Sequence, residues 1–161
     1  MIDFKNHKTR RWIWFFIAVL WMALIFSFSA ADGTQSQQQS TVVTKIVTEV
    51  IGVEPTHKDF FKIEFTVRKV AHLCLFAGLG FIFCGYFGEF QVTKKQRLLF
   101  STLASMAYAA LDEIHQYFVP LRAARLFDVF IDTAGGLIGA ATFLLVLFLI
   151  NLIFKSKKKA V

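Results

Sequence analysis

The sequence has 161 residues, of which 56% are hydrophobic, with 20 Phe and only 2 Pro. This composition is too apolar for an ordinary soluble domain, and the length fits one membrane domain covering residues 1–161. The net charge of +7 does not indicate a nucleic-acid-binding protein, because the Lys and Arg residues follow the ends of apolar segments.

Four apolar segments predict an all-α fold, an integral membrane bundle of four transmembrane helices. Residues 12–31 contain no charge, and about 20 apolar residues suffice to cross a hydrocarbon core of ~30 Å. Residues 70–88, 98–118 and 128–154 are the other predicted spans, and polar groups interrupt the middle two. The first span also has features of a signal peptide, but it exceeds the usual apolar core of roughly 7–15 residues, so we expect a retained helix.

The basic residues predict the topology. Four Lys and Arg residues precede the first span, three lie between the second and third, and four follow the fourth, which makes eleven of the 18 in the chain. Only two acids, Asp3 and Glu89, accompany them. Because cytoplasmic loops carry an excess of Lys and Arg, the sequence predicts an N-in, C-in, multi-pass protein of the lipid bilayer.

Residues 32–67 form the extracytoplasmic segment in this topology. The segment opens with a polar run that contains GTQSQQQS. Apolar residues then recur at helical spacing, which predicts an amphipathic helix between the first and second spans; they are Val42, Val43, Ile46, Val47, Val50 and Ile51. Gly52 and Pro55 end this helix. We interpret it as lying on the outer membrane surface or covering the bundle, and the alternative is a lid over a site.

Small residues predict where helices approach closely. Gly135 and Gly139 form a GxxxG pattern in the fourth span, and the third span has Ser101, Ser105 and Ala109 at the same spacing. Small side chains let helix backbones come together in lipid. We expect these residues to pack inside one bundle, and formation of a homo-oligomer is the alternative.

Charged and polar residues gather at the predicted outer ends of the spans. A charge inside a span costs roughly 2.5–3.5 kcal/mol on insertion scales, so these groups are paired, form a site, or do both. Four are cations and four are acids, and the formal charges balance. At about 100° per residue, Asp112, His115 and Gln116 share one helix face. The full set is Arg68, Lys69, His72, Asp112, Glu113, His115, Gln116, Arg122, Arg125, Asp128 and Asp132.

Three sequence blocks resemble the VanZ-like family of small bacterial membrane proteins. They read RKVAHLCLFAGLGF, DEIHQYFVPLR and DVFIDTAGGLIG, and the FSFSA and GTQSQQQS runs are similar to the family's first block. The family is named for an accessory protein linked to resistance against the glycopeptide teicoplanin. The resemblance implies a protein of the bacterial cytoplasmic membrane that contributes to such resistance. It also implies that all of the polar and charged residues named above, except Arg125, occupy positions of the family's motifs.

One position departs from the family pattern. The family usually has Gly before the arginine of the outer turn, whereas here Leu121 precedes Arg122. A glycine at that position would permit a positive φ. The shape of this turn and the direction of the Arg122 side chain therefore depend on how Leu121 is accommodated.

Three hypotheses account for the polar set. In the preferred one, the residues bind a cell-envelope ligand, such as a lipid-linked cell-wall precursor, a peptidoglycan stem terminus or a lipoglycopeptide, with the arginines holding carboxylate or phosphate. In the second, the protein is an enzyme that acts on a lipid-linked or cell-wall substrate. Either His72, Asp112 or His115 supplies acid–base chemistry, or the enzyme depends on a divalent metal, for which the residues with suitable ligand types are His72, His115, Asp112, Asp128 and Asp132. In the third, the ion pairs only support a scaffold. The ligand types for a metal are present, but no metal-binding spacing is, so no metal and no cofactor are predicted.

Overall fold

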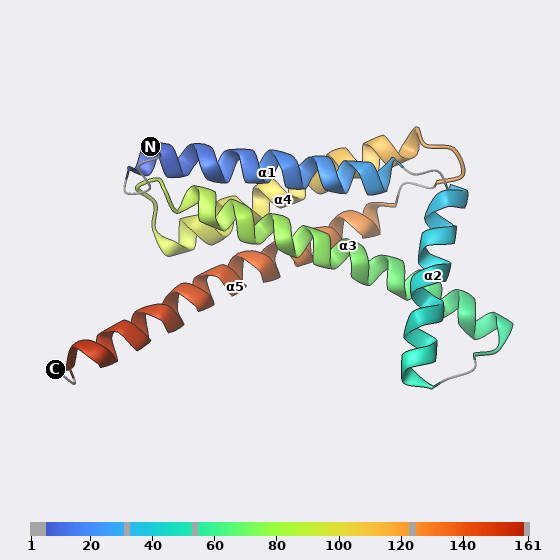
Figure 1. The fold of residues 1–161 in the computed structure, drawn as a ribbon. Coiled ribbons are helices and arrows are strands. Elements are labelled where there is room, and N and C mark those ends of the chain that lie inside the picture. Colours follow the sequence, from blue (N-terminus) through green and yellow to red (C-terminus); the bar gives the residue numbers. More distant parts are fainter. Residues whose placement is uncertain (1–5, 31–32, 53–54, 123–124, 160–161) are drawn as a thin grey trace.

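The computed structural model describes residues 6–30, 33–52, 55–122 and 125–159 and is helical throughout, with no strand in these ranges. The described residues form five α-helices, which are labelled in Figure 1. Their bounds are α1 His7–Ser29, α2 Gly33–Ile51, α3 His57–Phe87, α4 Lys94–Tyr117 and α5 Leu126–Lys159. The all-α prediction is confirmed.

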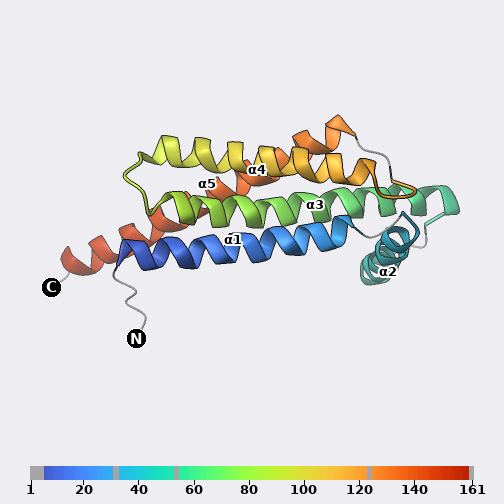
Figure 2. The ribbon, with the colours of Figure 1, turned by 90° about the horizontal axis from the view of Figure 1, so that it is seen from above.

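The helices α1, α3, α4 and α5 form an elongated bundle, and α2 lies across one end of it. α1, α3 and α4 run lengthwise, α5 crosses them, and α2 runs crosswise to α1 (Figures 1 and 2). Both chain ends lie at the end of the bundle opposite α2. α3 packs most extensively against α5, and α4 also packs against both of them.

Three helices in the described ranges are long and apolar enough to cross a membrane: α1, residues 59–87 of α3, and residues 126–155 of α5. α4 is not among them. It begins with Lys94, Lys95 and Arg97 and carries Asp112 and Glu113 near its end, which lowers its hydropathy. The prediction of a fourth transmembrane segment therefore stays a prediction.

The observed helix boundaries follow local capping chemistry. The Thr56 side chain caps α3 by accepting a hydrogen bond from the Asp59 backbone N–H, at 3.4 Å, so α3 starts well before the predicted second span. Thr93 and Gln96 form a capping box at the start of α4. Gly52 follows α2 with a φ of 71°, the left-handed conformation that commonly ends a helix.

Glycines bring α3 and α5 into backbone contact. A Cβ on Gly139 would collide with the Ala77 carbonyl, and one on Gly80 would collide with the Gly136 carbonyl. A Cβ on Gly136 would also meet the Ser105 side chain of α4. The GxxxG pattern is therefore used inside the bundle, as predicted. A larger residue at these positions would not let the helices cross so closely.

The buried core lies one helical turn below the predicted polar set. Ile25, Phe76, Leu79 and Ala109 form this core and are fully buried. Ile25 precedes Ser29 by four residues, Phe76 follows His72 by four, and Ala109 precedes Asp112 by three. The core thus forms a packed floor beneath the polar groups.

α2 packs with its polar side against the bundle. Thr44 is fully buried, and Thr41 Oγ1 donates a hydrogen bond of 2.6 Å to Glu64 Oε1 on α3. In contrast, Val42 and Ile46 are more than half exposed, and Val50 is 81% exposed. The predicted amphipathic helix is confirmed, but its buried contacts with α3 are polar and much of its apolar face is open.

A second ionic cluster ties α1 to the α3–α4 turn at the opposite end. The Glu89 side chain is only 2% exposed and accepts hydrogen bonds from Arg10 at 2.6 Å and from His7 at 2.9 Å. Arg11 donates to the Glu89 carbonyl through Nε and Nη2, at 3.0 and 2.8 Å. The basic N-terminal residues therefore hold this end of the bundle together.

Candidate functional site at the α2 end of the bundle

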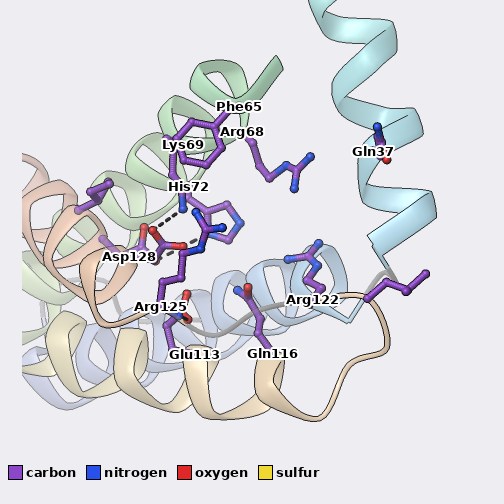
Figure 3. A pocket seen from close by; sticks show the side chains of 13 residues that line it. Gln37, Phe65, Arg68, Lys69, His72, Glu113, Gln116, Arg122, Arg125 and Asp128 are labelled. Atoms are coloured by element: carbon purple, nitrogen blue, oxygen red, sulfur yellow. Dashed lines mark hydrogen bonds and ion pairs between the residues drawn. The ribbon is translucent and has the colours of Figure 1, made fainter. Parts of the chain in front are cut away.

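A polar cavity of about 260 Å³ lies where α3, α4, α5 and the α4–α5 turn meet. Figure 3 shows the side chains of α3 and of the turn converging on it, with Gln37 of α2 facing it from across the opening. Nine of the eleven predicted site residues line the cavity: Arg68, Lys69, His72, Glu113, Gln116, Arg122, Arg125, Asp128 and Asp132. The structure thus brings together residues from three helices and a turn.

An ion pair crosses the cavity between α3 and α5. Lys69 Nζ pairs with Asp128 Oδ1, and their side chains are 20% and 15% exposed. The Lys69 ammonium also lies 5.2 Å from the centre of the Phe65 ring, a favourable cation–π geometry. One cation and one acid of the predicted set therefore satisfy each other and join two helices.

Asp112 lies at the bottom of the site rather than in its lining. It is 3% exposed, and its Oδ2 accepts hydrogen bonds from Ser29 Oγ at 2.8 Å and from Gln116 Nε2 at 2.9 Å. The predicted shared face of Asp112 and Gln116 is confirmed. His115 instead stacks on Phe26 of α1, with ring centroids 4.4 Å apart, and does not line the cavity.

Glu113 closes the turn between α4 and α5. Its Oε2 accepts a 2.7 Å hydrogen bond from the backbone N–H of Arg125. The Arg125 side chain is exposed, and its guanidinium lies 5.9 Å from the centre of the Phe65 ring. Arg122 Nη2 donates to the Phe28 carbonyl at 3.2 Å. These contacts connect the turn to α1, α3 and α4.

Leu121 adopts the left-handed conformation that the family glycine would permit. Its φ is 61°, and its side chain is 79% exposed. A left-handed backbone costs an L-residue roughly 1–2 kcal/mol. The turn therefore keeps this conformation at the expense of local strain, and Arg122 still reaches the cavity lining.

Arg68 joins the polar cavity to an apolar groove. The groove, about 390 Å³, lies between α1, α2 and α3 and shares Arg68, His72 and Arg122 with the cavity. Within the described residues, the buried Nε of Arg68 has no hydrogen-bond partner. A second apolar groove of about 560 Å³ continues between α2 and α3 and shares Val43, Val67 and Ala71 with the first. A charged chamber thus opens onto a long apolar surface.

Several site residues were not predicted from the sequence. Ser29, Phe65 and Gln37 contact the site, and Ser29 and Gln37 belong to segments that show no charge pattern of their own. The resemblance of the FSFSA and GTQSQQQS runs to the family's first block was the one available signal for Ser29 and Gln37. Phe65 gave no signal, because single aromatic residues are common in this Phe-rich chain.

The fold and the site define a helical membrane-type protein with a charged chamber at one end of its bundle. The family model described as VanZ/LLP1 matches residues 14–151. The chain therefore belongs to the VanZ family, and with its three apolar helices it is a VanZ-like membrane protein. No curated protein and no solved structure matches the chain.

Proposed function

We propose that this protein binds an anionic, amphiphilic ligand of the bacterial cell envelope at the outer face of the cytoplasmic membrane. The main support for this proposal is that the cation-lined cavity opens into the apolar grooves through Arg68, His72 and Arg122. A ligand with an anionic head and a long apolar chain has the chemistry of both parts. Lipid-linked cell-wall precursors and lipoglycopeptides belong to this class.

The proposed topology has four crossings with both chain ends in the cytoplasm. Both ends lie opposite α2 in the structure, and Lys94, Arg97 and Lys155 belong to that end by their positions at the start of α4 and the end of α5. The positive-inside bias then assigns the α2 end to the outer face. α4 crosses with two Ser residues and its acids turned to neighbouring helices, since Ser101, Ser105, Asp112 and Glu113 are all buried.

The cavity is suited to an anionic head group. Four cations line it against three acids, Glu113, Asp128 and Asp132. Asp128 is paired with Lys69, and Glu113 accepts from a backbone N–H. Arginine holds carboxylate or phosphate through two parallel hydrogen bonds, and Arg68 is placed at the junction where such a head would meet its chain.

The grooves are suited to the chain. They are lined mainly by aliphatic residues, and Val43 and Val47 of α2 form one wall while Val67, Val70 and Ala71 of α3 form the other. Burying apolar chain contributes about 0.8 kcal/mol for each CH₂ group. α2 therefore acts as the side wall of a binding groove, with its open apolar face toward lipid.

Binding is tested with three matched probes on the protein in detergent: farnesyl phosphate, farnesol and inorganic phosphate. We expect farnesyl phosphate to bind at least tenfold more tightly than either part alone, because it uses both cavity and groove. Arg68→Ala should weaken farnesyl phosphate binding by at least tenfold. Lys45→Ala, which removes an exposed cation of α2 outside the cavity, is the matched control. Equal binding of farnesol and farnesyl phosphate would contradict a role for the cations.

Resistance is tested by expression in a teicoplanin-susceptible bacterium. We expect the protein to raise the inhibitory concentration of teicoplanin, and Arg122→Ala and Asp128→Ala to abolish this increase at an unchanged protein level. Unchanged resistance in both variants would show that the cavity does not contribute to teicoplanin resistance.

An enzyme acting on the same ligand class is the second candidate. The observation that favours it is the pairing of His72 with Asp132, whose Nδ1 and Oδ2 atoms lie 3.7 Å apart at the cavity wall. A carboxylate beside an imidazole can orient it as a general base. Release of phosphate from farnesyl phosphate or its diphosphate, lost in His72→Gln, would support this candidate.

A further inference from the structure

We propose that His72, Asp112 and Asp132 bind a divalent transition-metal ion at the floor of the polar cavity. Each of the three side chains offers one ligand atom, and these atoms lie within 4.8 Å of one another. The residues come from α3, α4 and α5, so the folded bundle alone assembles the group. One imidazole nitrogen and two carboxylate oxygens form a donor set that suits Zn²⁺ or Mn²⁺.

Unsatisfied carboxylate oxygens support a bound cation independently. Asp112 is 3% exposed and Asp132 is 1% exposed. Within the described part of the chain, Asp112 Oδ1 and Asp132 Oδ2 are buried and lack a hydrogen-bond partner, and Asp132 Oδ2 has only the 3.7 Å contact with His72 Nδ1. Buried acids are costly unless they are paired or coordinate a metal. A divalent ion between the two carboxylates would neutralise both.

The surrounding hydrogen bonds orient the ligands. Ser29 Oγ and Gln116 Nε2 both donate to Oδ2 of Asp112, and this leaves Oδ1 available. Both donors are neutral, so they position the carboxylate without cancelling its charge. Outer hydrogen bonds of this kind commonly fix metal-ligating side chains.

The distances require the three ligand atoms to move closer together around the ion. With bonds of ~2.1 Å, two ligand atoms on one ion lie about 3.4 Å apart in tetrahedral geometry and at most about 4.2 Å apart. His72 Nδ1 and Asp132 Oδ2, at 3.7 Å, are already in this range. In tetrahedral geometry the widest separation in the group, which is at most 4.8 Å, must shorten by up to about 1.4 Å through rotation of the side chains.

A metal at this position would be reached from the cavity. His72 and Asp132 also belong to the cavity lining, and three protein ligands leave a coordination position open on that side. The predicted set balances four cations against four acids, so a divalent ion would make the site positive. This would favour an anionic head group, but the ion itself is expected to bind without any envelope ligand.

Zn²⁺ is the probe for the test. The full chain is purified in detergent without a polyhistidine tag, stripped with a chelator and titrated with ZnCl₂, and bound metal is counted after dialysis by mass spectrometry. We expect one Zn²⁺ per chain. Asp112→Asn and Asp132→Asn should lower the affinity at least 100-fold. Ser29→Ala, which removes one outer hydrogen bond, should lower it about tenfold. Asp59→Asn, an exposed acid of α3, should leave it unchanged.

The competing explanation is a proton shared by the two carboxylates. Absence of Zn²⁺ and Mn²⁺ binding by the unaltered chain would overturn the proposal and favour this explanation. A Zn²⁺ affinity in Asp112→Asn and in His72→Gln equal to that of the unaltered chain would also overturn it. The melting temperature of each variant reports its folding, and His72→Gln keeps both carboxylates if an aspartate variant does not fold. Farnesyl phosphate is absent from this titration, so its result is separate from that of the ligand-binding test.

Discussion

Lys69 on α3 and Asp128 on α5 form an ion pair whose side chains are 20% and 15% exposed. The pair lies just above the point where glycines let the same two helices touch. Removing one partner of a buried pair leaves the other charge unsatisfied and costs roughly 3–5 kcal/mol, less where the pair is partly exposed. The pair therefore supports both the helix crossing and the shape of the cavity.

We expect Lys69→Met to lower the free energy of unfolding by about 2–3 kcal/mol because Asp128 is left without its cation. The double variant Lys69→Met, Asp128→Leu should be less destabilised than Lys69→Met alone, since no charge remains unpaired. Denaturation in detergent, monitored by tryptophan fluorescence, measures both. The single variant Asp128→Leu completes the comparison. If the loss of unfolding free energy in the double variant equals the sum of the losses in the two single variants, Lys69 and Asp128 are not coupled.

Gly139→Leu should separate α3 from α5. The added side chain meets the Ala77 carbonyl, and overpacking of this kind costs about 1–3 kcal/mol or more. Ala134→Leu is the matched control, because Ala134 is on the same helix and exposed. A melting temperature lowered in Gly139→Leu but not in Ala134→Leu is the expected result. Equal melting temperatures would mean that this crossing contributes little.

Leu121→Gly should stabilise the protein. Glycine removes the cost of the left-handed backbone, roughly 1–2 kcal/mol, and loses about 0.5–1 kcal/mol through its greater freedom in the unfolded chain. The expected net gain is therefore up to about 1 kcal/mol. Leu121→Ala keeps the strained φ and should show no gain, so the difference in melting temperature between the two variants isolates the backbone effect.

Glu89→Gln should weaken the end of the bundle that lies away from the cavity. Hydrogen bonds that involve a charged group contribute about 1.5–3 kcal/mol, and Glu89 accepts two of them from His7 and Arg10. We expect a lower melting temperature together with unchanged binding of farnesyl phosphate and Zn²⁺. Loss of either binding activity in this variant would reveal coupling between the two ends of the bundle.

Much of the architecture could be read from the sequence. Apolar length predicted the helices, and helical spacing predicted the amphipathic segment and the shared face of Asp112 and Gln116. The GxxxG pattern predicted a close crossing. These features depend on residues within a few turns of one another, so local periodicity carries them. The sequence also predicted that the polar groups lie at one end of the bundle, because this depends only on their position along each helix.

Only the tertiary structure decided which groups meet. It pairs Lys69 with Asp128, bonds Ser29 to Asp112 across 83 residues of chain, and groups His72 with Asp112 and Asp132. It also turns the Ser and Thr face of α2 toward α3. These outcomes depend on the rotation of each helix about its axis and on where helices cross. Nonlocal packing sets both, and no short stretch of sequence encodes them.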